Sequence, residues 1–306
     1  MQTPILHFIT PPIPYFIDYG HAKYAPGERH VYRNCIGVFD LIAVTKGSLA
    51  VGENEKEWRL QKGELLILRP DCSHYGTLSC QEETEITWIH FQTFGSWREG
   101  SSMDDCLENQ PSLIANHKKN AYLNHCDVSS IFIPKYMKLS RKSLEDIQLL
   151  HQLKQEPKSM RNWKRQSTFQ RLLQHLDSEL ASLSDTTAIQ LAEKIEWFIH
   201  CNYQREISNA ILHKELNYHP NYLAKNMLKV YGMTPIEYLQ YYRIEQAKKL
   251  LLQTNWQVAK VAEEVGFHHV SYFSSCFVRR EGISPSNFRR KYTNAPYEFQ
   301  SKNNRK

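Results

Sequence analysis

The chain has 306 residues, 41% of them hydrophobic, and a formal net charge of +6. That length exceeds one ordinary compact core and fits two domains. No basic amino-terminal stretch or long apolar run occurs, which argues against a signal peptide or a membrane span. We therefore expect a cytoplasmic protein with no membrane partner. The seven cysteines include no Cys-x-x-Cys pair, which argues against a disulfide framework or a cysteine-rich zinc module.

The charge is divided unevenly along the chain. Residues 1–140 hold 13 Lys and Arg against 16 Asp and Glu (net −3), residues 141–184 hold 8 against 5 (net +3), and residues 185–306 hold 17 against 11 (net +6). A basic C-terminal region can neutralise DNA phosphates. Proteins that never touch nucleic acid also reach this charge, so the charge permits DNA binding without establishing it.

The first 140 residues have the pattern of a β-rich domain. Phe39–Thr45 and Leu65–Leu68 are short apolar runs bounded by Gly or Pro, and Glu85–Phe91 alternates with a period of two. Many short strands separated by turns predict a small barrel or sandwich. The polar residues 95–120 are expected to form a loop.

The chain changes from strands to helices after residue 140. Residues 129–139 either add a strand or lead out of the barrel. Apolar residues then recur at helical spacing over 144–154 and 169–180, and Pro157 separates the two amphipathic helices. These helices either pack against the barrel or form a dimer seam, and both readings remain open.

The C-terminal third is predicted to be helical throughout. Pro220, Pro235 and Pro285 each suit the first turn of a helix, and Asn217 and Gly266 occupy turns that need a left-handed residue. The expected helices cover residues 187–203, 209–216, 220–230, 235–253, 258–264 and 271–280, with a short helix after Pro285.

This helical third carries one motif twice, about fifty residues apart. The first copy contains Asn217-Tyr218, Tyr222-Leu223 and Gly232–Pro235, and the second contains Gly266-Phe267, Tyr272-Phe273 and Gly282–Pro285. A helix, a tight turn and a second helix presented to solvent is how many proteins place side chains in the major groove of DNA. The repeat therefore predicts two helix-turn-helix units.

The repeated motif also resembles the signature of a known family. The matching residues of the second copy are Val261–Phe267, Ser271–Ser274, Phe277, Gly282–Ser286 and Phe288-Arg289. They resemble the AraC/XylS family of bacterial transcription regulators, and Tyr238–Leu251 is similar to the rigid helix that connects the two units in that family. The resemblance implies double-stranded DNA and RNA polymerase as partners.

The N-terminal region resembles the cupin-type effector domain of sugar-responsive members of the same family. The matching residues are Gly20, Pro26-Gly27, Arg33, Asp40–Val44, Gly47, Leu60–Gly63, Pro70, His74–Gly76 and Trp88–Phe91. The expected fold is multidomain α+β: a cupin-like β-barrel over 1–140, a helical linker with possible dimerisation helices over 141–184, an all-α double helix-turn-helix domain over 185–295, and a polar tail over 296–306.

The first recognition helix should turn Leu223 and Met227 inward and place Asn221, Ala224, Lys225 and Lys229 on the groove side. Asn can pair with adenine and Lys can donate to guanine, so Asn221 and Lys225 are candidate base readers; the alternative is contact with phosphate or solvent only. One position departs from the family. His213 stands where relatives usually have a small buried Ala, the place that Ala262 holds in the second unit. A polar ring there must be partnered or partly exposed, and it can tilt the recognition helix.

The second recognition helix should bury Phe273 and Phe277. Its groove-facing candidates are Val270, Ser271, Ser274 and Ser275, and the candidates for phosphate contact, or else solvated surface, are His268, His269, Arg279 and Arg280. Relatives often carry a long basic residue where this chain has Ser275, and hydroxyls read bases less selectively than Arg does. This half is expected to contribute more to positioning than to sequence choice.

The effector candidates lie on the predicted strand 85–91 and near it. Ile86, Trp88 and His90 share one face by period two, and Trp suits the C–H face of a sugar. The resemblance places Arg33, Tyr75 and Trp88 where sugar-responsive relatives hold their effector, while Ile86 replaces a polar residue found in some of them. The alternative is that the aromatic residues are ordinary core.

An enzyme is the competing class. Metal-binding cupins resemble one another in a His-x-His pair followed by Glu, and this chain has no such pair among residues 20–60; three convergent ligands are needed for such a site. We therefore expect no catalytic residue, metal or cofactor. The hypothesis is a DNA-binding regulator controlled by a sugar-like effector and possible as a homodimer. The alternatives are a cupin enzyme fused to a DNA-binding module, or a ligand-independent regulator whose barrel is a dimerisation scaffold.

Overall fold

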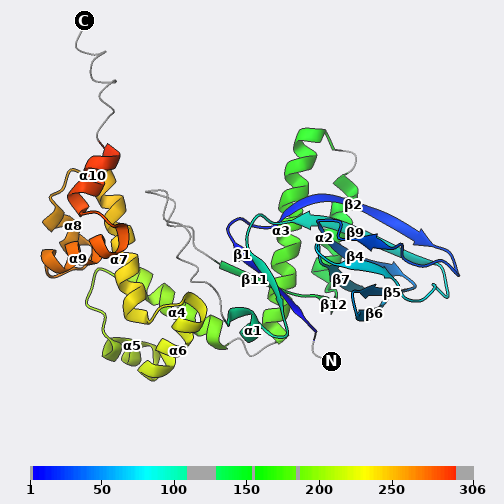
Figure 1. Ribbon diagram of the computed structural model, residues 1–306, viewed down its shortest axis with the longest axis horizontal. Helices are drawn as coiled ribbons and strands as arrows, with labels where there is room; N and C mark the ends of the chain where they lie inside the picture. Colours follow the sequence, from blue (N-terminus) through cyan, green and yellow to red (C-terminus); the bar gives the residue numbers. More distant parts are fainter. Residues whose placement is uncertain (1–2, 109–128, 154–155, 184–186, 294–306) are drawn as a thin grey trace, which may run out of the picture. The chain divides into compact units, whose positions relative to one another are not determined.

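The computed structural model describes residues 3–108, 129–153, 156–183 and 187–293 (Figure 1). These residues form two compact units, one holding the described residues up to 183 and the other those from 187 onwards. The first is rich in strands and the second is helical, so the expected multidomain α+β class with an all-α C-terminal domain is confirmed.

The first unit combines three sheets with three helices. Its strands are β1 (Ile5–Thr10), β2 (Tyr15–Tyr24), β3 (Arg33–Asn34), β4 (Phe39–Lys46), β5 (Ser48–Glu53), β6 (Lys56–Gln61), β7 (Glu64–Leu68), β8 (Ser73–Gly76), β9 (Thr84–Gln92), β10 (Trp97–Gly100), β11 (Ser129–Pro134) and β12 (Tyr136–Lys138). Its helices are α1 (Met103–Leu107), α2 (Arg141–Gln152) and α3 (Lys158–Leu183). The strand orders are β10-β1-β11, β12-β7-β4-β9-β2 and β3-β8-β5-β6. Within the described ranges these ladders do not close into one barrel.

The five-stranded sheet is buried on both faces, which explains the continuous apolar run in β4. Ile42 and Val44 point into a core shared with β5 and β6 of the four-stranded sheet. Leu41 and Ala43, on the opposite face, belong to a core shared with β1, β11 and the two long helices. A strand covered on both sides needs no polar alternation, and the first six residues of β4 are all buried.

Helices α2 and α3 pack against the first unit. Phe169 of α3 is wholly buried, with its ring 5.2 Å from that of Phe91 and 6.1 Å from that of Phe16. The side-chain amide of Gln166 accepts from the Phe16 N–H at 3.0 Å and donates to its carbonyl at 2.7 Å, so it pairs with the edge strand β2 as a neighbouring strand would. Of the two readings open for these helices, packing is confirmed, and dimerisation stays a prediction.

The loop expected over residues 95–120 is wrong at its start. Strand β10 pairs with β1 and helix α1 follows it. The polar composition concealed a strand because Trp97 alone carries the packing, with its ring 4.8 Å from that of Phe39. Residues 109–128 lie outside the described part of the chain.

The second unit is a chain of seven helices within its described residues. They are α4 (Thr187–Asn202), α5 (Asn209–Leu216), α6 (Pro220–Tyr231), α7 (Pro235–Gln253), α8 (Val258–Glu264), α9 (Val270–Glu281) and α10 (Pro285–Thr293). The bounds predicted for the six fully specified helices agree within one residue at each end. In the part of the chain that the structure describes, no helix is long and apolar enough to cross a membrane.

The long helix α7 belongs to two cores. Tyr238 and Leu239, in its first half, pack with α4, α5 and α6. Ile244, Ala247 and Leu251, in its second half, pack with α8, α9 and α10. Each helix-turn-helix unit therefore has its own core, and both cores include α7.

Gly266, in the turn of the second helix-turn-helix unit, contacts the residues that follow α4. Its φ is +86°, and a Cβ at this position would lie 2.7 Å from the carbonyl oxygen of Tyr203. Arg243 of α7 donates to the same carbonyl at 2.7 Å and to that of Arg205 at 2.6 Å. Glycine is required here by both backbone conformation and space.

Candidate nucleic-acid interface and effector site

The first recognition helix, α6, begins at a capped turn and exposes the predicted readers. The ring of His219 accepts from the Asn221 N–H at 3.3 Å, and Asn217 ends α5 at φ 60°. Leu223 is buried as predicted. Asn221 is exposed, as is Lys225 one turn later, and Lys229 after them is half-buried. All three lie at the spacing of one helical face, so a groove placed against that face meets them together.

Two exposed tyrosines of the repeated motif lie on either side of the start of α6, and the sequence pattern alone does not identify them as site residues. Tyr218 and Tyr222 are each 41% exposed, and their ring centroids lie 5.8 Å apart. The buried amide of Asn226 donates to the Tyr222 carbonyl at 2.7 Å. The sequence does contain a signal for these exposed tyrosines. An aromatic residue stands on each side of a helix start, at positions that the core does not require to be apolar.

His213 does not lie beneath the recognition helix. The ring is exposed, whereas Ala262, at the matching position of the second unit, is wholly buried. Its Nδ1 lies 2.9 Å from the carbonyl oxygen of Tyr218, to which it donates. The expectation of a partnered, exposed ring is confirmed. The ring bridges the turn between α5 and α6.

The second recognition helix, α9, presents smaller groups. Phe273 and Phe277 are wholly buried. Val270 is 41% exposed, and Ser275 is exposed with its hydroxyl donating to the Ser271 carbonyl one turn earlier at 3.0 Å. Since the helix takes the proton of Ser275, that hydroxyl offers acceptor lone pairs to a partner. The remaining predicted contacts are His268, His269 and Ser271, which are exposed, and Ser274, which is half-buried.

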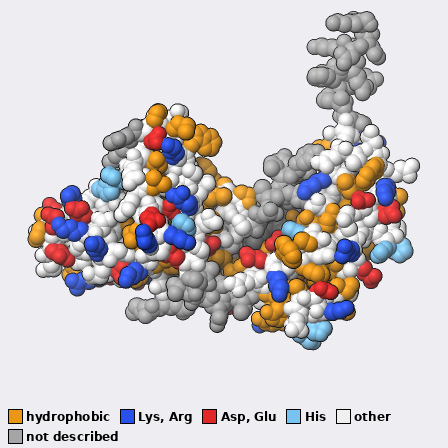
Figure 2. Space-filling model, turned by 180° about the vertical axis from the view of Figure 1, so that it is seen from behind, with side chains coloured by type: hydrophobic (Ala, Val, Ile, Leu, Met, Phe, Trp, Pro, Cys, Tyr) orange, Lys and Arg blue, Asp and Glu red, His pale blue; other side chains and the backbone are white. Residues whose placement is uncertain are grey.

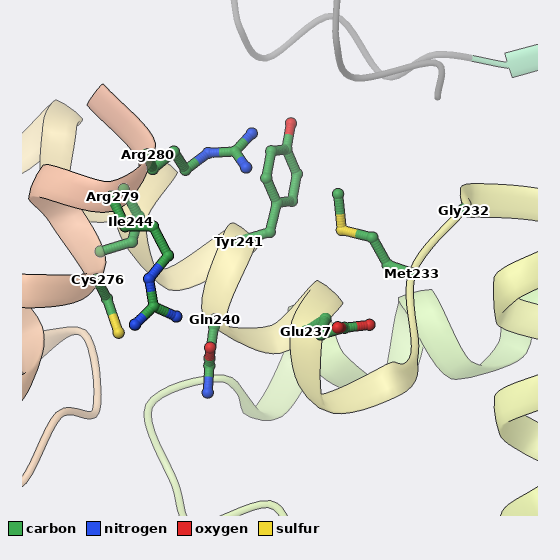
Figure 3. A pocket seen from close by; sticks show the side chains of 9 residues that line it. All are labelled: Gly232, Met233, Glu237, Gln240, Tyr241, Ile244, Cys276, Arg279 and Arg280. Atoms are coloured by element: carbon green, nitrogen blue, oxygen red, sulfur yellow. The ribbon is translucent and has the colours of Figure 1, made fainter. Parts of the chain in front are cut away.

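The two arginines at the end of α9 differ in their surroundings. The Arg280 guanidinium lies 3.9 Å from the centre of the Tyr241 ring (Figure 3). Its Nε donates to a carboxylate oxygen of the wholly buried Glu245 at 3.3 Å. Arg279 is exposed. Pairing with the buried carboxylate holds Arg280 against α7, which gives Arg280 an internal partner. Phosphate contact by Arg279 and Arg280 stays a prediction.

Charge alone does not locate the DNA-binding face. On the face of the second unit seen in Figure 2, Lys and Arg side chains are scattered among hydrophobic ones and do not form a single patch. The exposed faces of the two recognition helices carry the assignment instead.

In the N-terminal unit the structure brings Arg33, Trp88 and His90 together. The rings of Trp88 and His90 are 4.6 Å apart on one face of β9. Arg33 donates to Asp40 at 3.1 Å, and the other Asp40 oxygen is 3.7 Å from His90 Nε2. The indole lies over Gly20, where an added Cβ would be 2.3 Å from its Cζ2. Glycine is needed here because the aromatic ring occupies the space of a side chain.

Two of the predicted effector residues lie apart from this group. Tyr75 points away from the face that carries His74, because neighbouring residues of a strand face opposite sides. Its hydroxyl donates to the Asn54 carbonyl at 3.0 Å. Ile86 shares the face of Trp88 but is 2% exposed and belongs to the core between the two sheets.

Four buried polar residues near Arg33 and Trp88 escaped the sequence prediction of the site. They are Tyr24, His30, Asp40 and His74. Asp40 lies inside an apolar run of the sequence, and His74 is identified there only as part of the stretch that resembles the cupin-type domain. Among the described residues no group of three His, Cys, Asp or Glu side chains is arranged to hold a metal ion. What these residues offer is hydrogen bonding.

Comparison with known proteins identifies relatives over most of the chain. The model of an AraC-like ligand binding domain matches residues 18–116, and that of a helix-turn-helix domain matches residues 212–291. The uncharacterized HTH-type transcriptional regulator YisR of Bacillus subtilis is 30% identical over 294 residues, which are 94% of this chain and 97% of the relative. The arabinose operon regulatory protein of Escherichia coli is 25% identical over 251 residues, 80% of this chain and 77% of that protein. The solved C-terminal domain of AraT, a response regulator from Geobacillus stearothermophilus, is 28% identical, with 35% of this chain and 89% of that chain covered and a TM-score of 0.33.

Replacing each of the two arginines separately distinguishes their roles. We expect Arg279→Ala to reduce the slope of log affinity against log salt concentration by about one, as loss of one phosphate contact does, with unfolding unchanged. Arg280→Ala should leave this slope unchanged. It should lower the free energy of unfolding of the C-terminal unit by about 1–2 kcal/mol, because Glu245 loses a partner. DNA titrations over a salt series and urea unfolding measure the two effects. A slope change in Arg280→Ala without loss of stability would contradict its internal role.

Proposed function

Because the chain belongs to the AraC family of transcription regulators, we propose that it binds DNA sequence-specifically under the control of a small polar effector, a sugar or related metabolite, held by the N-terminal domain. The observation that carries this proposal is the pair of exposed recognition helices, each with its own core and both cores built on α7. A helix-turn-helix unit uses its second helix to reach base edges.

Helix α7 has a length suited to two successive major grooves. Its 19 residues span about 28 Å at the rise of an α-helix, and successive grooves on one face of DNA are about 34 Å apart. Its start is fixed by a capping box between Thr234 and Glu237. The two recognition helices are therefore held apart by a rigid element.

Discrimination between DNA sequences is proposed to come mainly from the first helix-turn-helix unit. Asn221 and Lys225 can each make contacts that distinguish one base from another. The second unit offers Ser271 and Ser275, whose hydroxyls discriminate less, with Arg279 for a phosphate. The exposed histidines His268 and His269 at the start of α9 add candidates for backbone contact.

The effector is proposed to act by population shift, as far as it binds one arrangement of the chain better than another. Arg33, Trp88 and His90 supply charge, an aromatic face and an imidazole at one place, which suits a ligand with both polar and C–H surfaces. The match to a regulator named for an arabinose operon supports a sugar. RNA polymerase and a second copy of the chain are further proposed partners.

Lys225→Ala tests base reading by α6. We expect specific binding to weaken about tenfold and non-specific binding much less, because a base contact acts only at the cognate site. Titration of cognate and scrambled duplexes at one salt concentration measures both, and Lys214→Ala, an exposed lysine on α5, is the control. Equal losses on the two duplexes would reduce Lys225 to a phosphate contact.

Trp88→Ala tests the effector site. We expect transcription from the regulated promoter to lose its response to carbon source, while DNA affinity without effector stays unchanged, because the indole lies in the other domain. A reporter assay over a panel of carbon sources measures the response. Trp163→Ala, which removes a 78% exposed indole on α3, should keep it. An intact response in Trp88→Ala would contradict the assignment of Trp88 to the effector site.

A further inference from the structure

Near His90, whose ring contacts that of Trp88, lies a group of buried polar atoms without hydrogen-bond partners. Asp40 and His74 are each 1% exposed. Asp40 Oδ1 and His74 Nε2 have no hydrogen-bond partner among the described residues, and neither has His90 Nε2. An unsatisfied buried polar group costs about 1–3 kcal/mol, and folded proteins keep few of them. Asp40 Oδ1 and His90 Nε2 lie 3.7 Å apart, too far for a hydrogen bond, so neither satisfies the other. Three such atoms in neighbouring residues indicate a partner from outside the chain.

These atoms belong to neighbouring residues. Asp40 lies opposite His90 in the pairing of β4 with β9, and Arg33 lies opposite His74 in the pairing of β3 with β8. The 3.1 Å bond from Arg33 to Asp40 joins the two pairs across the facing sheets. The side chains of Arg33 and His90 are 31% and 21% exposed. Asp40 and His74 thus form a floor, and Arg33, His90 and Trp88 form its partly exposed rim.

A chain of hydrogen bonds assigns the proton on His74. Tyr24 Oη lies 3.0 Å from His30 Nδ1, and His30 Nε2 lies 3.1 Å from His74 Nδ1. If the Tyr24 hydroxyl donates to His30, then His30 donates to His74, and the His74 proton must be on Nε2. The reverse order would leave the phenol proton of Tyr24 without an acceptor in the described part of the chain. His74 therefore presents a donor and Asp40 an acceptor.

The floor carries little net charge. Arg33 and Asp40 offset each other as an ion pair. Burial lowers the pKa of His30 to about 4 and also lowers the pKa of His74, so both rings are neutral at neutral pH. An anionic ligand would bring a charge that no free cation on the floor balances, whereas a hydroxyl group both donates and accepts without adding charge.

We propose that Asp40 and His74 hold one hydroxyl group of an uncharged, polyhydroxylated effector, which donates to Asp40 Oδ1, accepts from His74 Nε2 and lays a C–H face on Trp88. The inference rests on the proposed function, since it identifies the anchoring residues and the ligand class of the same effector site. Hydrogen bonds to a buried carboxylate are stronger than those between neutral groups, so Asp40 is the main anchor.

The test uses calorimetry of the full chain with three sets of probes: neutral aldopentoses and aldohexoses, hexuronic acids, and hexose 6-phosphates. We expect a neutral sugar to bind best, and its affinity to fall at least about tenfold in Asp40→Asn and in His74→Gln. Glu85→Gln is the matched control, because Glu85 lies on the opposite face of β9 and pairs with Lys23. Near-UV circular dichroism checks that each variant is folded.

A second measurement needs no ligand and no variant. Long-range ¹H–¹⁵N spectra of the wild-type chain at neutral pH should show His30 and His74 both neutral with the proton on Nε2. A His74 proton on Nδ1 would overturn the donor–acceptor arrangement.

The outcomes separate this inference from the wider proposal. Preference for uronic acids or phosphates overturns the uncharged class. If a neutral sugar binds Asp40→Asn and His74→Gln as well as the wild-type chain, Asp40 and His74 do not anchor it. The proposal of an effector domain then stands. Absence of binding by every probe, together with an intact promoter response in Trp88→Ala, overturns both the inference and the effector part of the proposed function.

Discussion

The helix α7 is the constraint on which the DNA-binding unit depends, because two recognition helices can address one duplex only at a fixed separation. Glu245 is wholly buried, and Lys248 is 1% exposed beside it. Lys248 bonds both Glu245 and Glu281, and Arg280 joins the same group from α9. Removing one member of a buried charge network leaves another uncompensated. The second recognition helix is therefore tied to α7 by charges as well as by apolar packing.

The same rigid frame supports two unequal surfaces. α6 presents the amide of Asn221 and the ammonium group of Lys225, next to a turn bridged by His213. α9 presents hydroxyl groups, and that of Ser275 already donates its proton to a carbonyl of its own helix. Rigidity lets the second unit fix the position of the first even when it reads few bases itself. In the N-terminal unit the division is similar: the apolar core between the sheets holds the fold, and the unsatisfied polar atoms of Asp40, His74 and His90 are those that we propose a ligand to contact.

The sequence could predict elements that depend on local signals. Pro220 and Pro235 at helix starts and Asn217 and Gly266 in turns placed the helices within one residue of their bounds. It could not show that Arg280 points toward Glu245, because the two residues are 35 positions apart and meet only through the packing of α7 on α9. Asp40 was concealed for a related reason, since its neighbours in β4 are apolar on both faces. Residue contacts across sheets and between helices carry this information, and period and spacing do not.

Selection of binding sites from random DNA by the full chain, followed by methylation interference on the selected duplex, measures the division of recognition most directly. We predict contacts in two major grooves about ten base pairs apart on one face, with most of the sequence preference in the half that α6 occupies. Contacts in a single groove, or equal sequence preference in both halves, would contradict a rigid pair of unequal recognition helices.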